Sequence, residues 1–429
     1  MSAAAPAPLP PAALLRALFE AAVDAARPER ALAAHLPPRP AGRTVVIGAG
    51  KASAEMAAAF EALWPGPLEG LVVTRTGHAA PTRRIEVVEA AHPVPDAAGE
   101  AAARRLLDLV AGCGPDDLIV ALVSGGGSAL LALPPPGSSL AELQALYRAL
   151  LESGAGIAAM NTVRKHVSLI LGGRLAAAAP ATPMLSLVIS DVPGDDPALI
   201  GSGPTVPDPS TRQAALAVLA RRGIDPGPAL RAWLESPAAD NPGPGHPAFA
   251  NKSARVVAAA QRSLEAAAAL ARRHGYATLV LGDAIEGEAR EAAKVHAGIV
   301  RAIRRHGAPL PAPCIVLSGG ETTVTIRGRG GRGGRNGEFA LALAAALEGL
   351  PGVHALAADT DGIDGMAENA GALVGPDTLQ RAAAAGLSAA DHLDRNDSHG
   401  FFAALGDLLV TGPTRTNVND FRAILIDPA

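Results

Sequence analysis

The sequence predicts an α/β protein with open, doubly wound sheets, and two features of its hydrophobic pattern carry this prediction. Short apolar runs alternate along the chain with alanine-rich or amphipathic stretches, which is the arrangement of repeated βαβ units. Nearly all of the apolar runs are continuous, as expected of parallel strands that are buried on both faces. The expected strands are 44–50, 70–74, 117–127, 184–191, 277–283, 313–321, 353–362 and 408–414. The expected helices are 51–63, 97–111, 140–152, 211–222, 252–274, 287–306 and 338–349.

The length and composition predict two compact domains. A chain of 429 residues is long enough for more than one domain, and its 49% hydrophobic and 18% charged residues exclude global disorder. The segment 224–247 is rich in proline and glycine, which is typical of a domain boundary. We therefore expect an N-terminal α/β domain (1–245) and a smaller C-terminal one (246–429).

The charge balance and the cysteine content exclude several classes of protein. The 37 Lys and Arg residues and 41 Asp and Glu residues give a net charge of −4, which argues against nucleic acid or an anionic membrane as partner. Cys113 and Cys314 cannot form a disulfide framework and have no zinc-site spacing. The first residues contain several prolines and no basic segment, so we expect no signal peptide, and no apolar run has the length and character of a membrane span. These features predict a cytoplasmic protein.

Polar motifs stand at the ends of the expected strands, where ligands bind in open parallel sheets. The first of them, GAGKAS (48–53), follows a strand and opens a helix. It differs from a dinucleotide fingerprint, because Ser53 replaces the third glycine and the next strand ends in Thr74-Arg75 without an acid. The residues required of a phosphate-loop motif are also absent. Lys51 is either a residue that binds an anionic ligand or an ordinary solvated lysine. A lysine in the first turn of a helix opposes the helix dipole, which favours the first interpretation.

Two further motifs offer groups that bind anions. SGGGS (124–128) follows a strand, and its three glycines let backbone N–H groups approach a phosphate or a carboxylate. The alternative for this motif is a flexible turn. NTVRKH (161–166) contains two cations and a histidine, and it is either a ligand-binding segment or an ordinary charged helix start.

Acidic clusters follow two other expected strands. SDVPGDD (190–196) includes Asp191, and DTDGIDG (359–365) has three carboxylates. Such clusters suit Mg²⁺ or a substrate hydroxyl, although Asp, Pro and Gly also form plain turns. The second cluster lacks the glutamate that closes a calcium-binding loop. We expect Asp191 and Asp359 to face one cleft between the two domains.

A glycine-arginine segment, RGRGGRGGR (327–335), lies between an expected strand and an expected helix. RNA-binding segments of this composition usually lie in disordered tails, so the position of this one instead predicts a mobile lid that brings cations to a polyanion. Arg335 stands at the N-terminus of the helix that follows. A dense polar turn, TGPTRTNVND (411–420), follows the last expected core strand.

Together these motifs resemble the glycerate 2-kinases of the second type, whose C-terminal half is the domain called MOFRL. The resemblance covers nearly the whole chain and is carried by GAGKAS, HPVPDAAG, SGGGSALL, NTVRKHVS, SDVPGDDPALIGSGPT, LSGGETTVT, GGRNGEFALA, DTDGIDG and TGPTRTNVND. It implies an N-terminal Rossmann-like domain, a distinct α/β C-terminal domain and an active site in the cleft between them. It also implies transfer of the γ-phosphoryl group of ATP to the 2-hydroxyl of D-glycerate, with Mg²⁺. The last motif more often has glycine where this chain has Arg415, and glycine takes a positive φ more readily than arginine does.

The resemblance also implies the residues of the site. Lys51 and Arg335 are expected as catalytic cations, and Asp191 as an acidic residue of the catalytic site. Asp359 and Asp361 are expected to bind Mg²⁺. The residues expected to bind nucleotide or substrate are Gly48, Gly50, Ser53, Ser124, Gly125, Gly126, Gly127, Ser128, Lys165, Asn336, Glu338 and Asn417. The sequence leaves open which glycine loop holds ATP and which holds glycerate, whether the 3-hydroxyl is used instead, and whether the protein is a monomer or a homodimer.

The chemistry of these motifs favours a kinase over two alternatives. Phosphoryl transfer depends on positioning and charge neutralisation, which Lys51, Arg335, carboxylate-bound Mg²⁺ and the glycine loops supply. An NAD(P)H-dependent hydroxypyruvate reductase, an older label of the family, needs an intact nicotinamide-binding fingerprint that this chain lacks. A non-catalytic sugar-acid sensor explains the glycine loops, but it gives no reason for the two cations and the acids to occur together.

Overall fold

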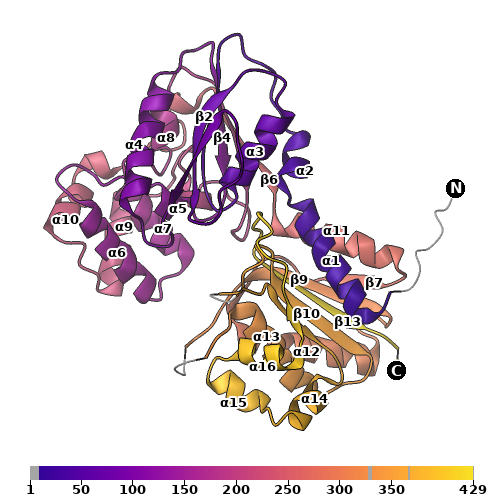
Figure 1. Ribbon diagram of the computed structural model, residues 1–429. Helices are drawn as coiled ribbons and strands as arrows, with labels where there is room; N and C mark the ends of the chain where they lie inside the picture. Colours follow the sequence, from indigo (N-terminus) through magenta and orange to yellow (C-terminus); the bar gives the residue numbers. More distant parts are fainter. Residues whose placement is uncertain (1–8, 327–330, 366–367, 429) are drawn as a thin grey trace. The chain divides into compact units, whose positions relative to one another are not determined.

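The computed structural model describes residues 9–326, 331–365 and 368–428, and the chain forms two compact units (Figure 1). The parallel-sheet unit is Pro28–Val257, and the mixed-sheet unit joins the N-terminal segment up to Arg27 to the chain from Ala258 onward. The expected break near residue 245 therefore precedes the observed change of unit. The expectation that the first residues belong to the N-terminal domain also differs from the structure, because α1 (Pro11–Ala25) packs in the mixed-sheet unit.

The parallel-sheet unit is built on six strands in the order β3-β2-β1-β4-β5-β6, the order of doubly wound dinucleotide-binding folds. β1 pairs in parallel with β2 and β4, so that Val46 lies opposite both Gly70 and Val120. β1, β4 and β5 are buried along their whole length, which confirms the interpretation of the continuous apolar runs. The strands are β1 (Thr44–Ala49), β2 (Glu69–Arg75), β3 (Ile85–Ala90), β4 (Leu118–Val123), β5 (Met184–Ile189) and β6 (Lys252–Ala258).

Helices pack on this sheet and also form a helical core of their own. α4 begins where the side chain of Asp96 accepts the N–H of Gly99, and α6 begins at a capping box of Ser139 and Glu142. Apolar side chains of α6, α7, α9 and α10 form the separate core, around Tyr147. The helices are α2 (Pro28–Ala33), α3 (Ser53–Leu63), α4 (Ala97–Ala111), α5 (Gly127–Leu130), α6 (Leu140–Glu152), α7 (Ile157–His166), α8 (Arg174–Ala177), α9 (Arg212–Arg222) and α10 (Pro228–Glu235), with 3₁₀ turns at Ile200–Ser202, Pro237–Ala239 and Pro247–Phe249.

The mixed-sheet unit corrects the expectation of parallel sheets throughout. Its main strand order is β12-β11-β10-β13-β9-β7, and β8 pairs with β9. The central strand β13 is antiparallel to both β9 and β10. Among the strand pairs of this sheet in the described residues, only those of β7 and β8 with β9 are parallel. The strands are β7 (Ala277–Val280), β8 (Ile285–Glu288), β9 (Cys314–Thr323), β10 (Val353–Asp359), β11 (Gly371–Val374), β12 (Leu408–Leu409) and β13 (Asp420–Ile426).

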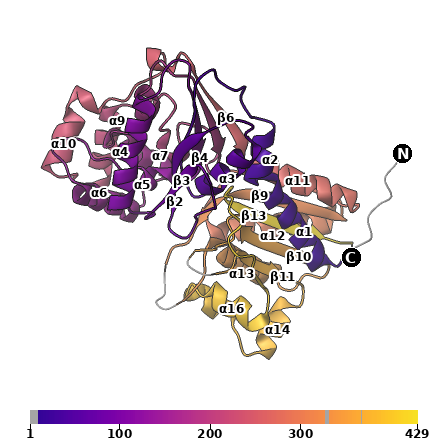
Figure 2. The ribbon, with the colours of Figure 1, turned by 45° about the horizontal axis from the view of Figure 1, so that its top comes forward.

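Helices cover both faces of this sheet (Figure 1 and Figure 2). Alternate residues of β13 point to opposite faces: Phe421 packs with α1 and α11, whereas Ile424 packs with α12 and α13. The remaining helices are α11 (Ala260–Arg273), α12 (Ala289–His306), α13 (Arg335–Leu347), α14 (Thr378–Ala384), α15 (Ala389–Asp394) and α16 (Ser398–Leu405). None of the helices in the described part of the chain has both the length and the apolar character needed to cross a bilayer.

Candidate active site

Lys51 lies on a turn that hydrogen bonds fix at the carboxyl end of β1. Its backbone N–H donates to the carbonyl of Gly125 (2.8 Å), and the N–H of Ala52 donates to Ser124 Oγ (3.0 Å). Gly50 has a φ of +144°, and a Cβ at this position would lie 2.1 Å from Ser124 Oγ. The turns after β1 and β4 are therefore held together. The order in which strands are added to the sheet reverses between β1 and β4, and such a switch point is where doubly wound sheets bind ligands.

Asp191 and His92 meet the same turns. Asp191 follows β5, and its carboxylate lies against Gly125, since a Cβ on that glycine would be 1.5 Å from Asp191 Oδ2. Gly126 has a φ of +84°, and a Cβ there would lie 3.2 Å from His92 Nε2 and 3.3 Å from Lys51 Cγ. The structure thus brings together three groups that the sequence placed at the ends of separate strands: Lys51, the glycine loop and Asp191.

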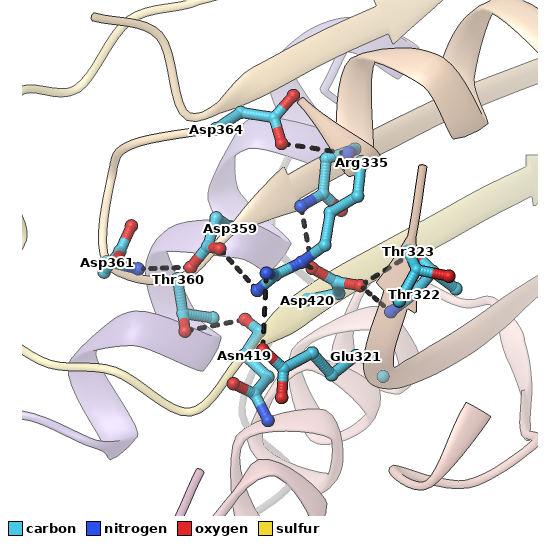
Figure 3. A network of polar contacts seen from close by, with 12 residues as sticks. Glu321, Thr322, Thr323, Arg335, Asp359, Thr360, Asp361, Asp364, Asn419 and Asp420 are labelled. Atoms are coloured by element: carbon cyan, nitrogen blue, oxygen red, sulfur yellow. Dashed lines mark hydrogen bonds and ion pairs between the residues drawn. The ribbon is translucent and has the colours of Figure 1, made fainter. Parts of the chain in front are cut away.

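Arg335, the first residue of α13, is held among three carboxylates in the mixed-sheet unit (Figure 3). Its Nε donates to Asp420 Oδ1 (2.6 Å), and its Nη2 donates to Asp359 Oδ2 (2.8 Å). Its Nη1 makes a longer contact of 3.4 Å with Glu321 Oε1. The side chains of Asp420 and Asp359 are buried, whereas that of Glu321 is 43% exposed. The Nη1 edge is therefore on the more open side of the cluster.

Asp420 connects this cluster to the central strand of the sheet. It begins β13 and lies directly opposite Asp359 on β10. Two carboxylates in such a position repel each other, and the guanidinium of Arg335 between them offsets the repulsion. Asp420 also accepts a hydrogen bond from Asn336 Nδ2 (2.8 Å) and pairs with the fully buried Arg422.

Burial and neighbouring charges move the pKa values of the two aspartates in opposite directions. Burial and the adjacent Asp361 raise the pKa of Asp359 well above its usual range, and Arg335 offsets this only in part. Burial alone would raise the pKa of Asp420, but Arg335 and Arg422 hold it below its usual value. Burial would lower the pKa of Arg335, yet Asp420 and Asp359 raise it well above normal. The cluster thus places a firmly ionised carboxylate next to one that takes up a proton readily.

Asp364 closes the N-terminus of α13. Its Oδ1 and Oδ2 accept the backbone N–H groups of Asn336 (2.9 Å) and Gly337 (2.7 Å). Burial raises the pKa of Asp364 to about 6, although these hydrogen bonds act in the other direction. The carboxylate occupies the place of an anionic ligand at this helix end, so a phosphate near α13 has to be bound by side chains such as Arg335.

Asp359 and Asp361, the expected Mg²⁺ ligands, lie on one tight turn. The N–H of Asp361 donates to Asp359 Oδ1 (3.0 Å), and Asp361 Oδ1 accepts the N–H of Ile363 (2.8 Å). In the described residues no group of three or more His, Cys, Asp or Glu side chains is arranged to hold a metal ion. Mg²⁺ often takes one or two carboxylates and completes its shell with water and substrate phosphates. The two-carboxylate turn fits that donor set, and a cation there would relieve the repulsion that raises the pKa of Asp359.

A cavity of about 940 Å³ adjoins Arg335 within the mixed-sheet unit, a volume typical of small-molecule sites. Its lining includes Thr322 and Thr323 from β9 and the cationic side chains of Arg332 and Arg395. The first part of the expected lid, residues 327–330, lies outside the described residues. The second part, up to Arg335, contributes to the lining of this cavity.

Several residues that are expected to bind ligands make contacts within the protein. Gly48 lies inside β1, where a Cβ would be 2.3 Å from the carbonyl oxygen of Leu122, and Ser53 Oγ donates to that same carbonyl (2.9 Å). Lys165 forms a buried ion pair with Asp208 (3.2 Å). These contacts explain why glycine, serine and lysine stand at positions 48, 53 and 165 even when no ligand is considered.

Two other expected ligand residues also have partners within the protein. Glu338 is buried and pairs with Arg290. The hydroxyl of Ser128 shares a hydrogen bond of 2.6 Å with that of Ser202.

The sequence analysis placed the polar turn 411–420 after the last core strand. In the structure this turn instead leads into a further core strand, β13. Arg415 has a φ of 65° and Asn419 a φ of 63°, so Arg415, where the resemblance implies glycine, does adopt the left-handed conformation. The N–H of Thr414 donates to the carbonyl of Asp361 (3.0 Å), which places this turn against the acidic turn. Asn417, another expected ligand residue, is buried, and its Oδ1 accepts the N–H of Asn419 (3.2 Å).

Sequence reasoning missed Asp420, Glu321 and Asp364 as members of the Arg335 cluster. Each lies in or beside a motif that was recognised, but their positions depend on the pairing of β13 with its neighbours. A signal was present, because a continuous apolar run at 423–426 begins three positions after Asp420. That run identifies a strand, and the acid at its start is then a candidate for the site.

Family profiles match both parts of the chain. Residues 14–235 match a family described as a domain of unknown function (DUF4147), and residues 314–420 match the MOFRL family. The chain is 40% identical over 406 residues to a D-glycerate 2-kinase of Thermotoga maritima, covering 94% of this chain and 95% of the relative. It is 37% identical over 390 residues to a glycerate 2-kinase of Pyrococcus horikoshii, covering 88% and 86%.

Two further comparisons concern the name of the activity and the fold. A relative from Agrobacterium vitis, 54% identical over 418 residues and covering 96% of this chain and 94% of its own, carries the provisional name hydroxypyruvate reductase. The crystal structure of a glycerate kinase from Thermotoga maritima matches with a TM-score of 0.87 at 38% identity, covering 97% of this chain and 99% of that chain. With near-complete coverage of kinases in sequence and in structure, this chain belongs to the glycerate 2-kinase family.

Proposed function

We propose that this protein transfers the γ-phosphoryl group of ATP to the 2-hydroxyl of D-glycerate, giving ADP and 2-phosphoglycerate. The observation that carries the proposal is Arg335, an arginine fixed by buried carboxylates in the lining of a cavity. Phosphoryl transfer depends on positioning and charge neutralisation more than on covalent chemistry with the protein. The relatives that are named kinases of glycerate support this choice of substrate.

Arg335 is suited to stabilise the transferring phosphoryl group. Its Nε and Nη2 bind Asp420 and Asp359, so the plane of the guanidinium is fixed before a substrate arrives. Within the described residues its Nη1 has only the 3.4 Å contact with Glu321. We assign this edge to the γ-phosphate oxygens, because donors that are already oriented stabilise the transition state most.

Asp359 and Asp361 would hold Mg²⁺, because this ion often takes two carboxylates from the protein and completes its shell with water and substrate phosphates. The ion, when bound, neutralises charge on the phosphate oxygens of ATP. The two carboxylates lie on one turn that hydrogen bonds keep in place, so they are oriented without the ion.

Lys51 and Asp191 are assigned to the reaction from the parallel-sheet unit. The 2-hydroxyl oxygen forms a bond to the γ-phosphorus, the bond from that phosphorus to the bridging oxygen of ADP breaks, and the hydroxyl proton needs an acceptor. We assign the proton to the carboxylate of Asp191. This carboxylate lies so close to Gly125 that a residue larger than glycine would not fit at position 125. Lys51 binds an anionic oxygen of the reactants.

Reduction of hydroxypyruvate with NAD(P)H is the second candidate function. The strand order of the parallel sheet and the provisional name of the Agrobacterium vitis relative favour it. However, β2 ends at Thr74 and Arg75 without an acid for the ribose hydroxyls. Ser53 also stands where the third glycine of the fingerprint would be.

The variant Arg335→Lys tests the proposal. It keeps the charge but loses the planar fork, so we expect turnover with ATP and D-glycerate to fall at least about tenfold. ADP formation is measured directly, and the melting temperature is followed to detect a loss of folding. The exposed Arg148 provides a matched control as Arg148→Lys, which should keep wild-type turnover. Near-normal turnover in Arg335→Lys would remove this residue from the reaction.

A further inference from the structure

Among the residues that the structure describes, Arg164 is a buried cation that differs from the other buried Arg and Lys side chains. Each of the others has a carboxylate partner, and the pairs are Lys165 with Asp208, Arg290 with Glu338, and Arg422 with Asp420. Arg164 is 7% exposed, its Nε is fully buried without a hydrogen-bond partner, and no carboxylate of the described residues pairs with it. Burying an unpaired charge costs far more than burying a paired one, so Arg164 is suited to bind an anionic group from outside the chain.

Arg164 is nevertheless held in one place. Its guanidinium lies 4.8 Å from the ring centroid of Tyr147, which is on α6. One turn earlier on α6, Gln144 Nε2 donates to the carbonyl of Pro95 (2.7 Å). Residues three apart lie on the same face of a helix, so α6 places Arg164 beside the loop that contains His92 and Pro95.

His92 links Arg164 to the turn of Lys51. Its ring and the Lys51 side chain both lie against Gly126, as the contacts of that glycine show. Burial lowers the pKa of His92 to about 3, and the charges of Lys51, Arg75 and Arg164 act in the same direction. His92 is therefore neutral at neutral pH and can donate one ring N–H.

Positive charges gather around this histidine, because Lys51, Arg75 and Arg164 all act to lower its pKa, and His78 acts in the same direction. Asp191 brings a carboxylate to the same turns, against Gly125. A cluster of this kind attracts a ligand that carries negatively charged oxygens. Arginine provides the planar fork for such a group and lysine a point charge.

We infer that Arg164 and His92, together with Lys51, form a binding site for an anionic oxygen group, a carboxylate or a phosphate. This assigns Arg164, and not its neighbour Lys165, as the ligand-binding cation of the NTVRKH motif. The identity of the ligand rests on the proposed function, which offers the carboxylate of D-glycerate and the phosphates of ATP. The existence of the site does not rest on it.

The test compares the wild type with Arg164→Met, which keeps the length of the side chain and removes the charge. Isothermal titration uses D-glycerate, ATP without Mg²⁺, and inorganic phosphate as separate probes, and calorimetry gives the melting temperature without ligand. We expect Arg164→Met to bind at least one of these anions about tenfold or more weakly than the wild type does. Without ligand it should melt at the same or a higher temperature, because an unpaired buried charge has been removed.

Three further variants separate binding from folding. Lys165→Met leaves Asp208 buried without its partner, so it should melt at a lower temperature, and it should keep the anion affinity. Arg148→Met makes the same chemical change as Arg164→Met on the exposed face of α6, and should change neither property. Arg164→Lys keeps the charge, and its affinity should lie between those of the wild type and Arg164→Met.

The outcomes decide the inference independently of the kinase activity. A loss confined to D-glycerate identifies a carboxylate site, and a loss for phosphate and ATP identifies a phosphate site. Unchanged affinity for all three anions in Arg164→Met, or a wild type that binds none of them, overturns the inference. A lower melting temperature of Arg164→Met without ligand also overturns it, since the arginine would then be a structural residue. A wild type that binds an anion but transfers no phosphoryl group would contradict the proposed function alone.

Discussion

Arg335 carries a positive charge in the first turn of a helix, where the helix dipole disfavours it. Its ion pairs with Asp420 and Asp359 explain how the fold keeps it there. Lys51 stands just before another helix, α3, and the turns after β1 and β4 fix its backbone. In both cases a cation is held against its local preference, which is typical of a residue that is retained for binding or catalysis.

Replacing Lys51 by alanine separates its role in the reaction from any role in folding. The side chain is not part of a hydrophobic core, and alanine favours helices, so the melting temperature should change by less than about 2 °C. Turnover with ATP and D-glycerate should fall by about two orders of magnitude or more, because a transition-state charge is lost.

The exposed Lys294 serves as the control in this comparison, and Lys294→Ala should be fully active. An active Lys51→Ala enzyme would show that the reaction takes place elsewhere, and an unfolded one would show that the lysine is structural.

Asp364 predicts a pH dependence of stability. Its pKa is about 6 in the folded chain and near its ordinary value of 3.8 in the unfolded chain. Between pH of about 4 and about 6 the folded chain therefore binds the extra proton, so stability falls as the pH rises through this window. The shift corresponds to about 3 kcal/mol in the free energy of unfolding.

Asp364→Asn removes this titration and keeps one hydrogen-bond acceptor. Urea unfolding at a series of pH values should show a shallower loss of stability between pH of about 4 and 6 in the variant than in the wild type. Parallel curves for the two proteins over that window would show that Asp364 titrates normally.

At the scale of helices and strands, the sequence predicted the elements whose own pattern specifies them. The helices at 97–111, 140–152 and 211–222 were found with bounds that match to within a residue, since caps and amphipathic faces define them locally. The edge strand β3 was missed because it is half exposed and charged residues interrupt its apolar run. β6 was assigned to a helix because exposed residues alternate along it.

The strand β13 was the most consequential omission. It follows a polar turn near the end of the chain, so its apolar run was not recognised as a strand. Asp420 was missed with it, because its contact with Arg335 joins residues 85 positions apart and depends on the register of three strands. Lys51 and Arg335 were predicted from motifs, whereas the partners that orient them required tertiary structure.

The helix α1 gives an element-scale prediction. Phe19 on α1 is buried and packs edge to face on Phe421 of β13, with ring centroids 5.8 Å apart. Phe19→Ala leaves a cavity between α1 and the sheet, and should destabilise the mixed-sheet unit by about 3 to 5 kcal/mol. Hydrogen exchange should quicken in peptides from β10 and β13.

Peptides from β1 and β4, which belong to the parallel-sheet unit, should keep their exchange rates in Phe19→Ala. The control Glu20→Ala, at an exposed position of the same helix, should change neither unit. Unchanged exchange in β13 of Phe19→Ala would show that α1 does not stabilise this sheet.

At the scale of the whole molecule, the fold alone does not distinguish between phosphorylation of glycerate and reduction of hydroxypyruvate, the two activities after which relatives are named. A parallel sheet with the order of dinucleotide-binding folds hosts many chemistries, so the function has to be argued from side chains. The side chains favour phosphoryl transfer, because cations and carboxylates lie at the carboxyl end of the parallel sheet and around Arg335, and the fingerprint for a nicotinamide dinucleotide is incomplete. Both units are expected to be required, and Lys51→Ala and Arg335→Lys test one unit each.

The most direct test of the account is the identity of the product. The wild-type protein is incubated with ATP, Mg²⁺ and D-glycerate, and phosphorus NMR distinguishes 2-phosphoglycerate from 3-phosphoglycerate. A parallel reaction contains NADH, NADPH and hydroxypyruvate without ATP. The account predicts stoichiometric ADP and 2-phosphoglycerate in the first reaction and no reduced product in the second. Reduction of hydroxypyruvate without phosphorylation of glycerate would contradict it.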